Sequence, residues 1–250
     1  MKSFVINEQN VADFAEKIAT WIQEKVKQAC CNGVVLGMSG GVDCSVTARL
    51  CQLAGVDVQL VLMPYGDDMK NAKSSDHAMT LIEKFNFPYH VFDIKPAVDA
   101  LTLEKNSAAG LPLSVANIRP RVRMTYLYQL AQSDNRLVIG TSNLSERTVG
   151  YFTKWGDGAC DLNPLGMLTK QEVYALARHL DIPDCIINKK PSAELWDGQT
   201  DEEELGIAYA QIDAYIINGT SCYPDIDLKI EKKVTLSAHK RAQTPIFLGL

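Results

Sequence analysis

The sequence contains no Cys-x-x-Cys pair among its seven cysteines, and its four histidines lie far apart along the chain. Zinc sites need clustered ligands, and disulfide frameworks are typical of small secreted domains, so neither is indicated. The chain also lacks an apolar run of the roughly 18 residues that a membrane span needs. Residues 1–10 lack the features of a secretory signal. We therefore expect a cytoplasmic protein with reduced thiols and no membrane partner.

Positive charge is scarce as well. There are 25 Lys and Arg against 30 Asp and Glu, which gives a net charge of −5. This balance argues against a broad nucleic-acid surface, so any anionic ligand must meet local basic residues. At 250 residues, with 46% hydrophobic residues, the chain is long enough for one sizeable core. We expect a single domain over 1–250.

One segment, VVLGMSGGVDCS (34–45), has the layout of a phosphate-binding loop. An apolar strand is followed by glycines that permit close backbone approach, by the hydroxyl of Ser39, and by a helix that starts near Cys44. Asp43 would repel a bare phosphate, so its presence indicates a divalent cation between carboxylate and phosphate. The interpretation is ATP with Mg²⁺. A glycine-rich turn that binds no nucleotide is the alternative for this segment taken alone.

The loop is neither a Walker loop nor Gly-x-Gly-x-x-Gly, because the required lysine and glycine spacings are absent. Ser-Gly-Gly-x-Asp after a strand instead resembles the pyrophosphate loop of the N-type ATP pyrophosphatases. That resemblance implies cleavage of ATP to AMP and pyrophosphate.

Strands and helices are predicted to alternate over the first two thirds of the chain. Asn10 is expected to cap a helix that runs to about Cys30, and Gly55 to stop the helix 44–54. Further helices are expected at 71–86 and 119–132, and strands at 34–38, 58–63, 89–94 and 136–141. This order predicts an α/β fold with an open, mostly parallel sheet and helices on both faces. We expect a Rossmann-like sheet of five strands in all. The 39–43 loop, Met63 and Thr141 should then share the carboxyl edge.

Two other segments are candidates for ligand binding. Arg119, Arg121 and Arg123 fall within five residues, and arginine forks suit phosphate and carboxylate groups, although a solvated helix start would look the same. Residues 140–170 form a long, apparently irregular and glycine-rich stretch that holds several charged residues. Such stretches are usually functional, with an ordinary surface loop as the alternative.

Taken together, these motifs resemble the ammonia-dependent NAD synthetases over nearly the whole chain. The matching segments are the loop 37–45, MPYG (63–66), NIRPRVRM (117–124), GTSNLSE (140–146), GYFTKWGDGACDLNPLG (150–166), LTKQEVYALA (168–177), KKPSAELWDGQTDEEELG (189–206) and HKR (239–241). The resemblance implies a fold similar to the adenine nucleotide alpha hydrolases. It also implies a homodimer, with the helices around 119–132 and 10–30 at the two-fold axis.

The activity implied by this resemblance is a carbon–nitrogen ligase that completes NAD biosynthesis. The nicotinate carboxylate of deamido-NAD attacks ATP to form an acyl-adenylate and pyrophosphate, and ammonia then displaces AMP. The chain leaves no room for a glutaminase domain, so free ammonia, or ammonia from a separate protein, is the expected nitrogen donor.

The resemblance also implies roles for individual residues. Asp43 and Glu146 are expected to hold Mg²⁺, with Asp43 and Lys170 as the catalytic pair. The residues expected at ATP are Gly37, Met38, Ser39, Gly40, Gly41, Val42, Asp43, Cys44, Ser45, Met63, Thr141, Lys170 and Ser192. Those expected at deamido-NAD are Arg121, Arg123, Lys154, Asp161, His239 and Lys240, and the rings of Tyr151, Phe152 and Trp155 are candidates to stack on nicotinate.

Two positions depart from the family pattern. Cys44 stands where a serine is usual, which weakens one hydroxyl contact and suggests sensitivity to oxidation. Pro120 interrupts the arginine segment. Alternative functions are another pyrophosphatase, such as a transfer-RNA thiolating enzyme or a GMP synthetase, and a nucleotide sensor without catalysis. The charge balance argues against the RNA enzyme, and the presence of both Asp43 and Glu146 argues against the sensor.

Overall fold

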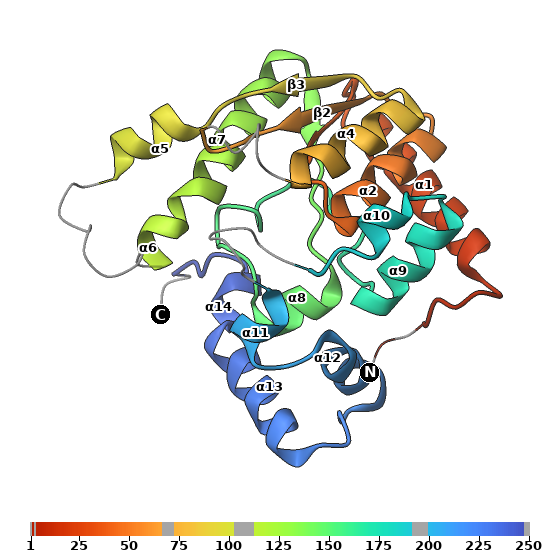
Figure 1. Ribbon diagram of the computed structural model, residues 1–250, viewed down its shortest axis with the longest axis vertical. Coiled ribbons are helices and arrows are strands. Elements are labelled where there is room, and N and C mark those ends of the chain that lie inside the picture. The colour runs from red at the N-terminus through yellow and green to blue at the C-terminus, as the bar shows by residue number, and fades with distance from the viewer. Residues whose placement is uncertain (1, 3, 67–72, 103–112, 192–199, 248–250) are drawn as a thin grey trace.

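A computed structural model describes residues 2, 4–66, 73–102, 113–191 and 200–247 (Figure 1). Its sheet consists of β1 (Gly33–Gly37), β2 (Val58–Leu62), β3 (Tyr89–Val91) and β4 (Arg136–Val138) in the order β3-β2-β1-β4. All three pairings are parallel, with Val34 opposite Val58 and Leu137. The prediction of a parallel sheet is confirmed. All the described strands therefore end at the same edge.

The expectation of five strands was wrong, because the sheet formed by the described residues has four. A fifth position is marked only by an isolated parallel bridge between Ile139 and Leu162. Leu162 stands between Asp161 and the Asn163-Pro164 pair, and a proline offers no backbone N–H to a ladder. The segment therefore forms a single β-bridge with the sheet, beside the contact of Asp161 with Val138, and then leaves it.

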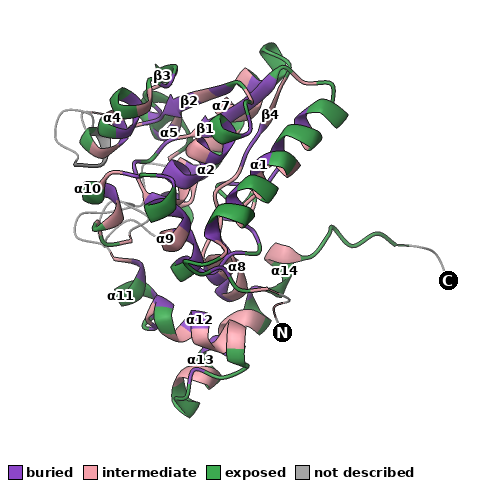
Figure 2. Ribbon diagram, turned by 90° about the vertical axis from the view of Figure 1, so that its right-hand side faces the viewer, coloured by how far each residue is buried: buried purple, intermediate pink, exposed green. Residues whose placement is uncertain are grey.

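Helices cover both faces of the sheet, as expected. On one face, Val34, Leu36 and Leu60 pack in a large core with α1 (Val11–Gln28), α2 (Val42–Leu53), α4 (Lys73–Phe85) and α9 (Lys170–His179). On the other face, Val35, Val61 and Val138 pack with α5 (Lys95–Leu101) and α7 (Ile118–Ser133). The central strands β1 and β2 are buried almost throughout (Figure 2), which explains their continuous apolar sequence, whereas the edge strand β3 is exposed.

A separate group of helices lies beyond the carboxyl edge of the sheet (Figure 1). It includes α8 (Leu144–Val149), α11 (Asp201–Leu205), α12 (Tyr209–Asn218) and α13 (Pro224–Leu236), which share a third apolar cluster around Ile212 and Ile230. Short helices complete the chain at α6 (Leu113–Ala116), α10 (Asp184–Ile187) and α14 (Ala238–Arg241). This group was not anticipated from the sequence.

Two local predictions at helix ends had opposite outcomes. Gly55 follows α2 with φ of 64°, so its role as a stop is confirmed. Asn10 does not cap α1: its side chain donates to the Val5 carbonyl at 2.9 Å and accepts from the Asn7 N–H at 2.8 Å. The side-chain amide is thus used by the turn that precedes the helix.

The stretch 140–170 is not irregular throughout, because it contains α8. This helix is stabilised by a capping box between Asn143 and Glu146 and ends at Gly150, whose φ is 70°. An Asn-x-x-Glu spacing followed by a glycine is a recognised helix signal, which the compositional prediction overlooked.

Candidate active site

The glycine loop joins β1 to α2, as predicted. The Met38 N–H donates to the Val61 carbonyl at 2.8 Å, and the chain turns at Gly40, whose φ is 76°. Gly41 is the residue before α2, which begins at Val42 rather than near Cys44. The first backbone N–H groups of a twelve-residue helix therefore lie directly beside the loop.

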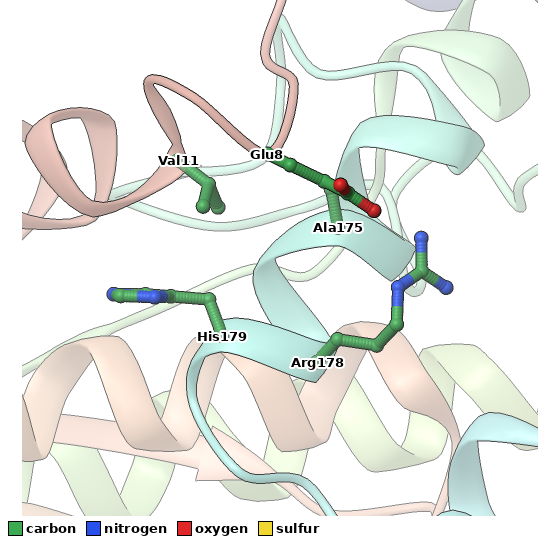
Figure 3. Close-up of a pocket in the computed structure, with 5 residues that line it drawn as sticks. All are labelled: Glu8, Val11, Ala175, Arg178 and His179. Atoms are coloured by element: carbon green, nitrogen blue, oxygen red, sulfur yellow. The ribbon is translucent and has the colours of Figure 1, made fainter.

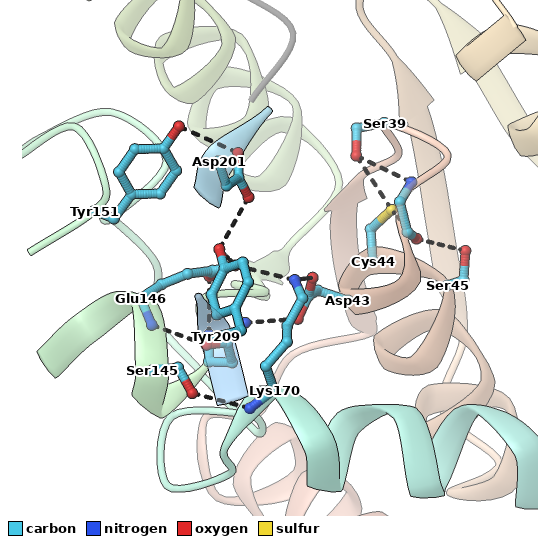
Figure 4. Close-up of polar contacts among 12 residues, drawn as sticks. Ser39, Asp43, Cys44, Ser45, Ser145, Glu146, Tyr151, Lys170, Asp201 and Tyr209 are labelled. Carbon is cyan, nitrogen blue, oxygen red and sulfur yellow. Dashed lines mark hydrogen bonds and ion pairs between the residues drawn. The ribbon is translucent and has the colours of Figure 1, made fainter. Parts of the chain in front are cut away.

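The side chains of Cys44 and Ser45 both point back to the loop (Figure 4). The Cys44 Sγ lies 3.1 Å from the Gly41 carbonyl oxygen and 3.4 Å from the Ser39 Oγ. The Ser45 hydroxyl donates to the same carbonyl at 2.8 Å. Cys44 is only 3% exposed, so its thiol braces the loop and is shielded from oxidants in solution.

Asp43, Glu146 and Lys170 come from three helices and meet in space (Figure 4). The Lys170 ammonium lies 2.6 Å from an Asp43 carboxylate oxygen and 3.3 Å from a Glu146 oxygen, across sequence separations of 127 and 24 residues. The exposed fraction is 4% for the lysine side chain and 16% for each carboxylate. One buried cation therefore faces two largely buried anions.

The electrostatics of this triad follow from burial. Burial raises the pKa of Glu146 to about 7, with Lys170 opposing the shift and the negative charge of Asp43 adding to it. Burial lowers the pKa of Lys170, but the attraction of Asp43 and Glu146 outweighs this effect, and its pKa lies above the ordinary value. Lys170 thus keeps its proton, and the site carries an excess of carboxylate over cationic groups.

Asn143 connects the two carboxylates and was missed in the sequence. Its Nδ2 donates to the Asp43 carboxylate at 2.9 Å and its backbone N–H to the Glu146 carboxylate at 3.2 Å, while its Oδ1 accepts the backbone N–H of Glu146 at 2.9 Å. The side chain is fully buried. The Asn-x-x-Glu capping pattern is the signal that could have identified it.

Tyr209 closes the site from α12. Its ring centroid lies 5.0 Å from the Lys170 Nζ, and its hydroxyl lies 2.9 Å from Asp201 and 3.5 Å from Glu146. Asp201 also accepts the Tyr151 hydroxyl at 3.1 Å. Burial raises the pKa of both tyrosines, so both remain protonated donors. Asp201 falls within the matching segment 189–206 without having been singled out, and no pattern in the sequence indicated Tyr209.

The basic residues expected at deamido-NAD come together from three segments. Arg121 donates to the Lys154 carbonyl at 3.4 Å, and the Lys154 ammonium donates to the His239 carbonyl at 2.7 Å. The Lys240 ammonium donates to the carbonyls of Gly150 and Phe152, each at 2.8 Å. Two of the predicted ligand lysines thus hold backbone carbonyls in this structure.

The other predicted residues have different surroundings. Arg123 donates to the Met63 carbonyl at 3.0 Å, and Met63 follows β2. Asp161 accepts the Tyr128 hydroxyl at 3.2 Å and the Val138 N–H at 2.8 Å, so it secures the end of β4. Thr141 lies three residues after β4, at the carboxyl edge. Ser192 lies outside the described residues.

The three aromatic residues Tyr151, Phe152 and Trp155 contact polar or charged side chains. Tyr151 faces Asp201 and Glu204, whereas the Lys240 Nζ lies 5.3 Å from the Phe152 ring centroid. Trp155 is 60% exposed, with the Lys154 Nζ 5.6 Å from its ring centroid. Of the three, Trp155 retains the most exposed ring surface for a ligand.

Among the described residues, no group of three or more His, Cys, Asp or Glu side chains is arranged to hold a metal ion, so Asp43 and Glu146 stand as a pair. Nor does any described helix combine the length and apolar composition required to cross a lipid bilayer.

A surface cavity of about 200 Å³ lies at the end of α9 that is far from Lys170 (Figure 3). Its lining is Glu8, Val11, Ala175, Arg178 and His179, so it is separate from the triad.

Comparison with known sequences gives one consistent family. A family model described as NAD synthase matches residues 14–244. The NH(3)-dependent NAD(+) synthetase of Finegoldia magna is 42% identical over 235 residues, which are 93% of this chain and 94% of that protein.

Two solved structures are similar over nearly their whole length. NMN synthetase from Francisella tularensis matches with a TM-score of 0.87 at 37% identity, over 95% of this chain and 99% of that chain. The NH3-dependent NAD synthetase from Campylobacter jejuni, in complex with the nitrate ion, matches with a TM-score of 0.77 at 33% identity, over 97% of this chain and all of that chain.

Proposed function

This chain belongs to the NAD synthase family, and from that premise we propose that it amidates deamido-NAD with ammonia at the expense of ATP. The products are NAD, AMP and pyrophosphate, and the reaction is the final step of NAD biosynthesis. The observation that carries the proposal is the convergence of Asp43, Glu146 and Lys170 beside the glycine loop.

The first half of the reaction activates a poor electrophile. The nicotinate carboxylate attacks the α-phosphorus of ATP, the bond to the β-phosphate oxygen breaks, and an acyl-adenylate and pyrophosphate form. Negative charge grows on the leaving pyrophosphate, where we propose that the N–H groups at the start of α2 and the ammonium of Lys170 stabilise it. Ammonia then attacks the acyl carbon, loses a proton and expels AMP.

We infer that Asp43 and Glu146 hold Mg²⁺. Both carboxylates already approach one cationic group, the Lys170 ammonium, and hard oxygen donors are the ligands that Mg²⁺ prefers. Two protein carboxylates leave coordination positions for phosphate oxygens and water. When bound, the ion would neutralise charge on the pyrophosphate. Lys170 would then serve a phosphate oxygen as a compact point charge.

For deamido-NAD, we propose the basic residues of the three converging segments. Arg121 is exposed and adjoins Lys154, which in turn adjoins His239. The remaining members of the proposed set are two further basic residues, Arg123 and Lys240, and one hydrogen-bond acceptor, Asp161.

A homodimer is also part of the proposal. Of the sixteen residues of α7, Pro120 and Ala131 are the buried ones, and its apolar residues Val122, Tyr126 and Leu130 are only partly covered. A second copy packed on this helix would complete their burial. The mass of the purified protein by light scattering tests this, and a strictly monomeric protein at micromolar concentration would contradict it.

One comparison favours a second substrate. The similarity to the Francisella tularensis NMN synthetase is greater, by TM-score and by identity, than the similarity to the Campylobacter jejuni NAD synthetase. Nicotinate mononucleotide carries the same carboxylate as deamido-NAD, so the same adenylation and amidation would yield NMN. The second candidate function is therefore amidation of the mononucleotide.

One assay tests both functions. Purified protein is incubated with ATP, Mg²⁺ and ammonium, together with either deamido-NAD or nicotinate mononucleotide, and AMP, NAD and NMN are quantified. We expect NAD and AMP in equal amounts, with the higher kcat/KM for deamido-NAD. A higher kcat/KM for the mononucleotide would establish the second candidate. If neither substrate stimulates AMP release, the proposal is overturned.

A further inference from the structure

Asp213 is a buried carboxylate in α12 that the proposed reaction does not use. Asp213 is 1% exposed, and α12, the helix that carries it, lies outside every motif of the sequence analysis. It accepts a short hydrogen bond from the Ser145 hydroxyl and a second, of 2.9 Å, from the Gln171 N–H. Asp213 therefore bonds to two other helices, α8 and α9.

Ser145 passes the connection on to Lys170. The backbone N–H of Lys170 lies 2.9 Å from the Ser145 Oγ, and an N–H can only donate, so Ser145 accepts this bond (Figure 4). Its own proton then goes to Asp213. The chain of donors runs from the Lys170 N–H through the Ser145 hydroxyl to the carboxylate. Ser145 has no exposed surface, so water cannot replace any of these partners.

The connected backbone positions are those that carry the triad. Ser145 immediately precedes Glu146 in α8, and Lys170 and Gln171 are the first two residues of α9. The first N–H groups of a helix have no partner within it, and a carboxylate both satisfies them and interacts favourably with the helix dipole. Asp213 supplies that carboxylate from a third helix. The relative position of α8 and α9, and with it the reach from Lys170 to Glu146, depends on this junction.

We propose that Asp213 and Ser145 are positioning residues that hold Lys170 and Glu146 at the separation the reaction requires. They do not touch the substrates. They act through the backbone: Ser145 accepts the N–H of Lys170, and Asp213 accepts the N–H of Gln171. These bonds fix the position from which the Lys170 side chain extends. This inference rests on the proposed function, since it concerns the rate of that reaction. A displacement of about 1 Å at a reacting group can lower kcat by roughly 100-fold.

The test uses two variants of the junction and one matched control. Asp213→Asn keeps the shape of the side chain but replaces one acceptor oxygen by a donor, and Ser145→Ala removes the hydroxyl. Asp227→Asn is the control, because Asp227 likewise accepts a hydroxyl, that of Thr220 at 2.6 Å, and an N–H, that of Ser221 at 2.7 Å. Asp227 lies on the neighbouring α13, and its two partners, Thr220 and Ser221, belong to neither α8 nor α9.

We expect Asp213→Asn and Ser145→Ala to lower kcat about 10- to 100-fold per folded enzyme, with KM for ATP and deamido-NAD changed less than about threefold. Asp227→Asn should retain wild-type kcat. The folded fraction of each variant is measured from its circular dichroism melt, and kcat is corrected for it.

The inference fails if the corrected kcat of both junction variants stays within about twofold of wild type, or if Asp227→Asn loses as much. It also fails if KM for both substrates rises while kcat is unchanged, because that pattern indicates lost binding. Activity of the wild type and of Asp227→Asn establishes the function independently, so an inactive wild type would refute the proposed function instead.

Discussion

Gly150 ends α8 with φ of 70°, directly before the loop that carries Lys154, and we expect Gly150→Ala to destabilise the protein strongly. Two costs add. A residue with a Cβ pays roughly 1–2 kcal/mol in the left-handed region. The new Cβ would also overlap the Cβ and Oγ of Ser237. Overpacking of a filled site costs a further 1–3 kcal/mol or so, and the sum is roughly 2–5 kcal/mol.

Ser237 cannot move away cheaply. Its Oγ donates to the Lys233 carbonyl at 2.6 Å and accepts from Arg241 at 2.8 Å, and the residue is 7% exposed. The same Arg241 guanidinium donates to the carbonyls of Arg147 and Thr148 at the end of α8. Relief of the overlap would therefore disturb the contact between α8 and α14.

Gly206 provides the matched control. It ends α11 with φ of 64°, but a Cβ there would meet nothing within 4 Å. Gly206→Ala should cost only the backbone component, roughly 1–2 kcal/mol. The free energy of unfolding of each variant is measured by guanidinium chloride denaturation with linear extrapolation. Equal losses for Gly150→Ala and Gly206→Ala would refute the argument from the Ser237 overlap.

Three further predictions concern the site and the core. Asp43→Asn should leave the melting temperature within a few degrees of wild type but lower kcat by about 100-fold or more, because a charged group at the pyrophosphate is lost; retained activity would mean the metal is held elsewhere. Arg121→Ala should raise KM for deamido-NAD about tenfold and leave KM for ATP nearly unchanged, since a charged hydrogen bond contributes about 1.5–3 kcal/mol; equal rises would assign it to the fold. Burial raises the pKa of the Cys51 thiol from 9.0 to about 12, so the stability it contributes is complete below pH 9 and is lost as pH rises from 9 to 12. The unfolding free energy of wild type should therefore fall between pH 8 and pH 10 by about 1.4 kcal/mol more than that of Cys51→Ala, and parallel curves would contradict this.

Local signals in the sequence were sufficient for the parallel sheet order and for the glycine loop between β1 and α2. Val34 to Leu36, the glycines after them and the amphipathic run to Leu53 specify a strand, a turn and a helix within about twenty residues. Such features depend on neighbours in the chain, so they can be read without a structure. The parallel order of the described strands placed the loop, Met63 and Thr141 at one edge, as predicted.

The sequence was insufficient where the outcome depended on contacts that the local pattern does not specify. Asn10 is a good capping residue by type, but its amide is taken by Val5 and Asn7. The ammonium of Lys240, which is a proposed ligand of deamido-NAD, donates to the carbonyls of Gly150 and Phe152, and the sequence did not indicate these contacts. A fifth strand was expected, but among the described residues only an isolated bridge between Ile139 and Leu162 marks its position.

The sequence by itself determined the family, the α/β alternation and the residue types available for nucleotide chemistry, because motifs and hydrophobic periods are local. Only the tertiary structure decided how those residues meet. It brings Lys170 between Asp43 and Glu146 and joins α8 and α9 through Ser145 and Asp213. The physical reason is burial: in a site closed to water each polar group must find a protein partner, and that partner is chosen by packing across the fold rather than by distance along the chain.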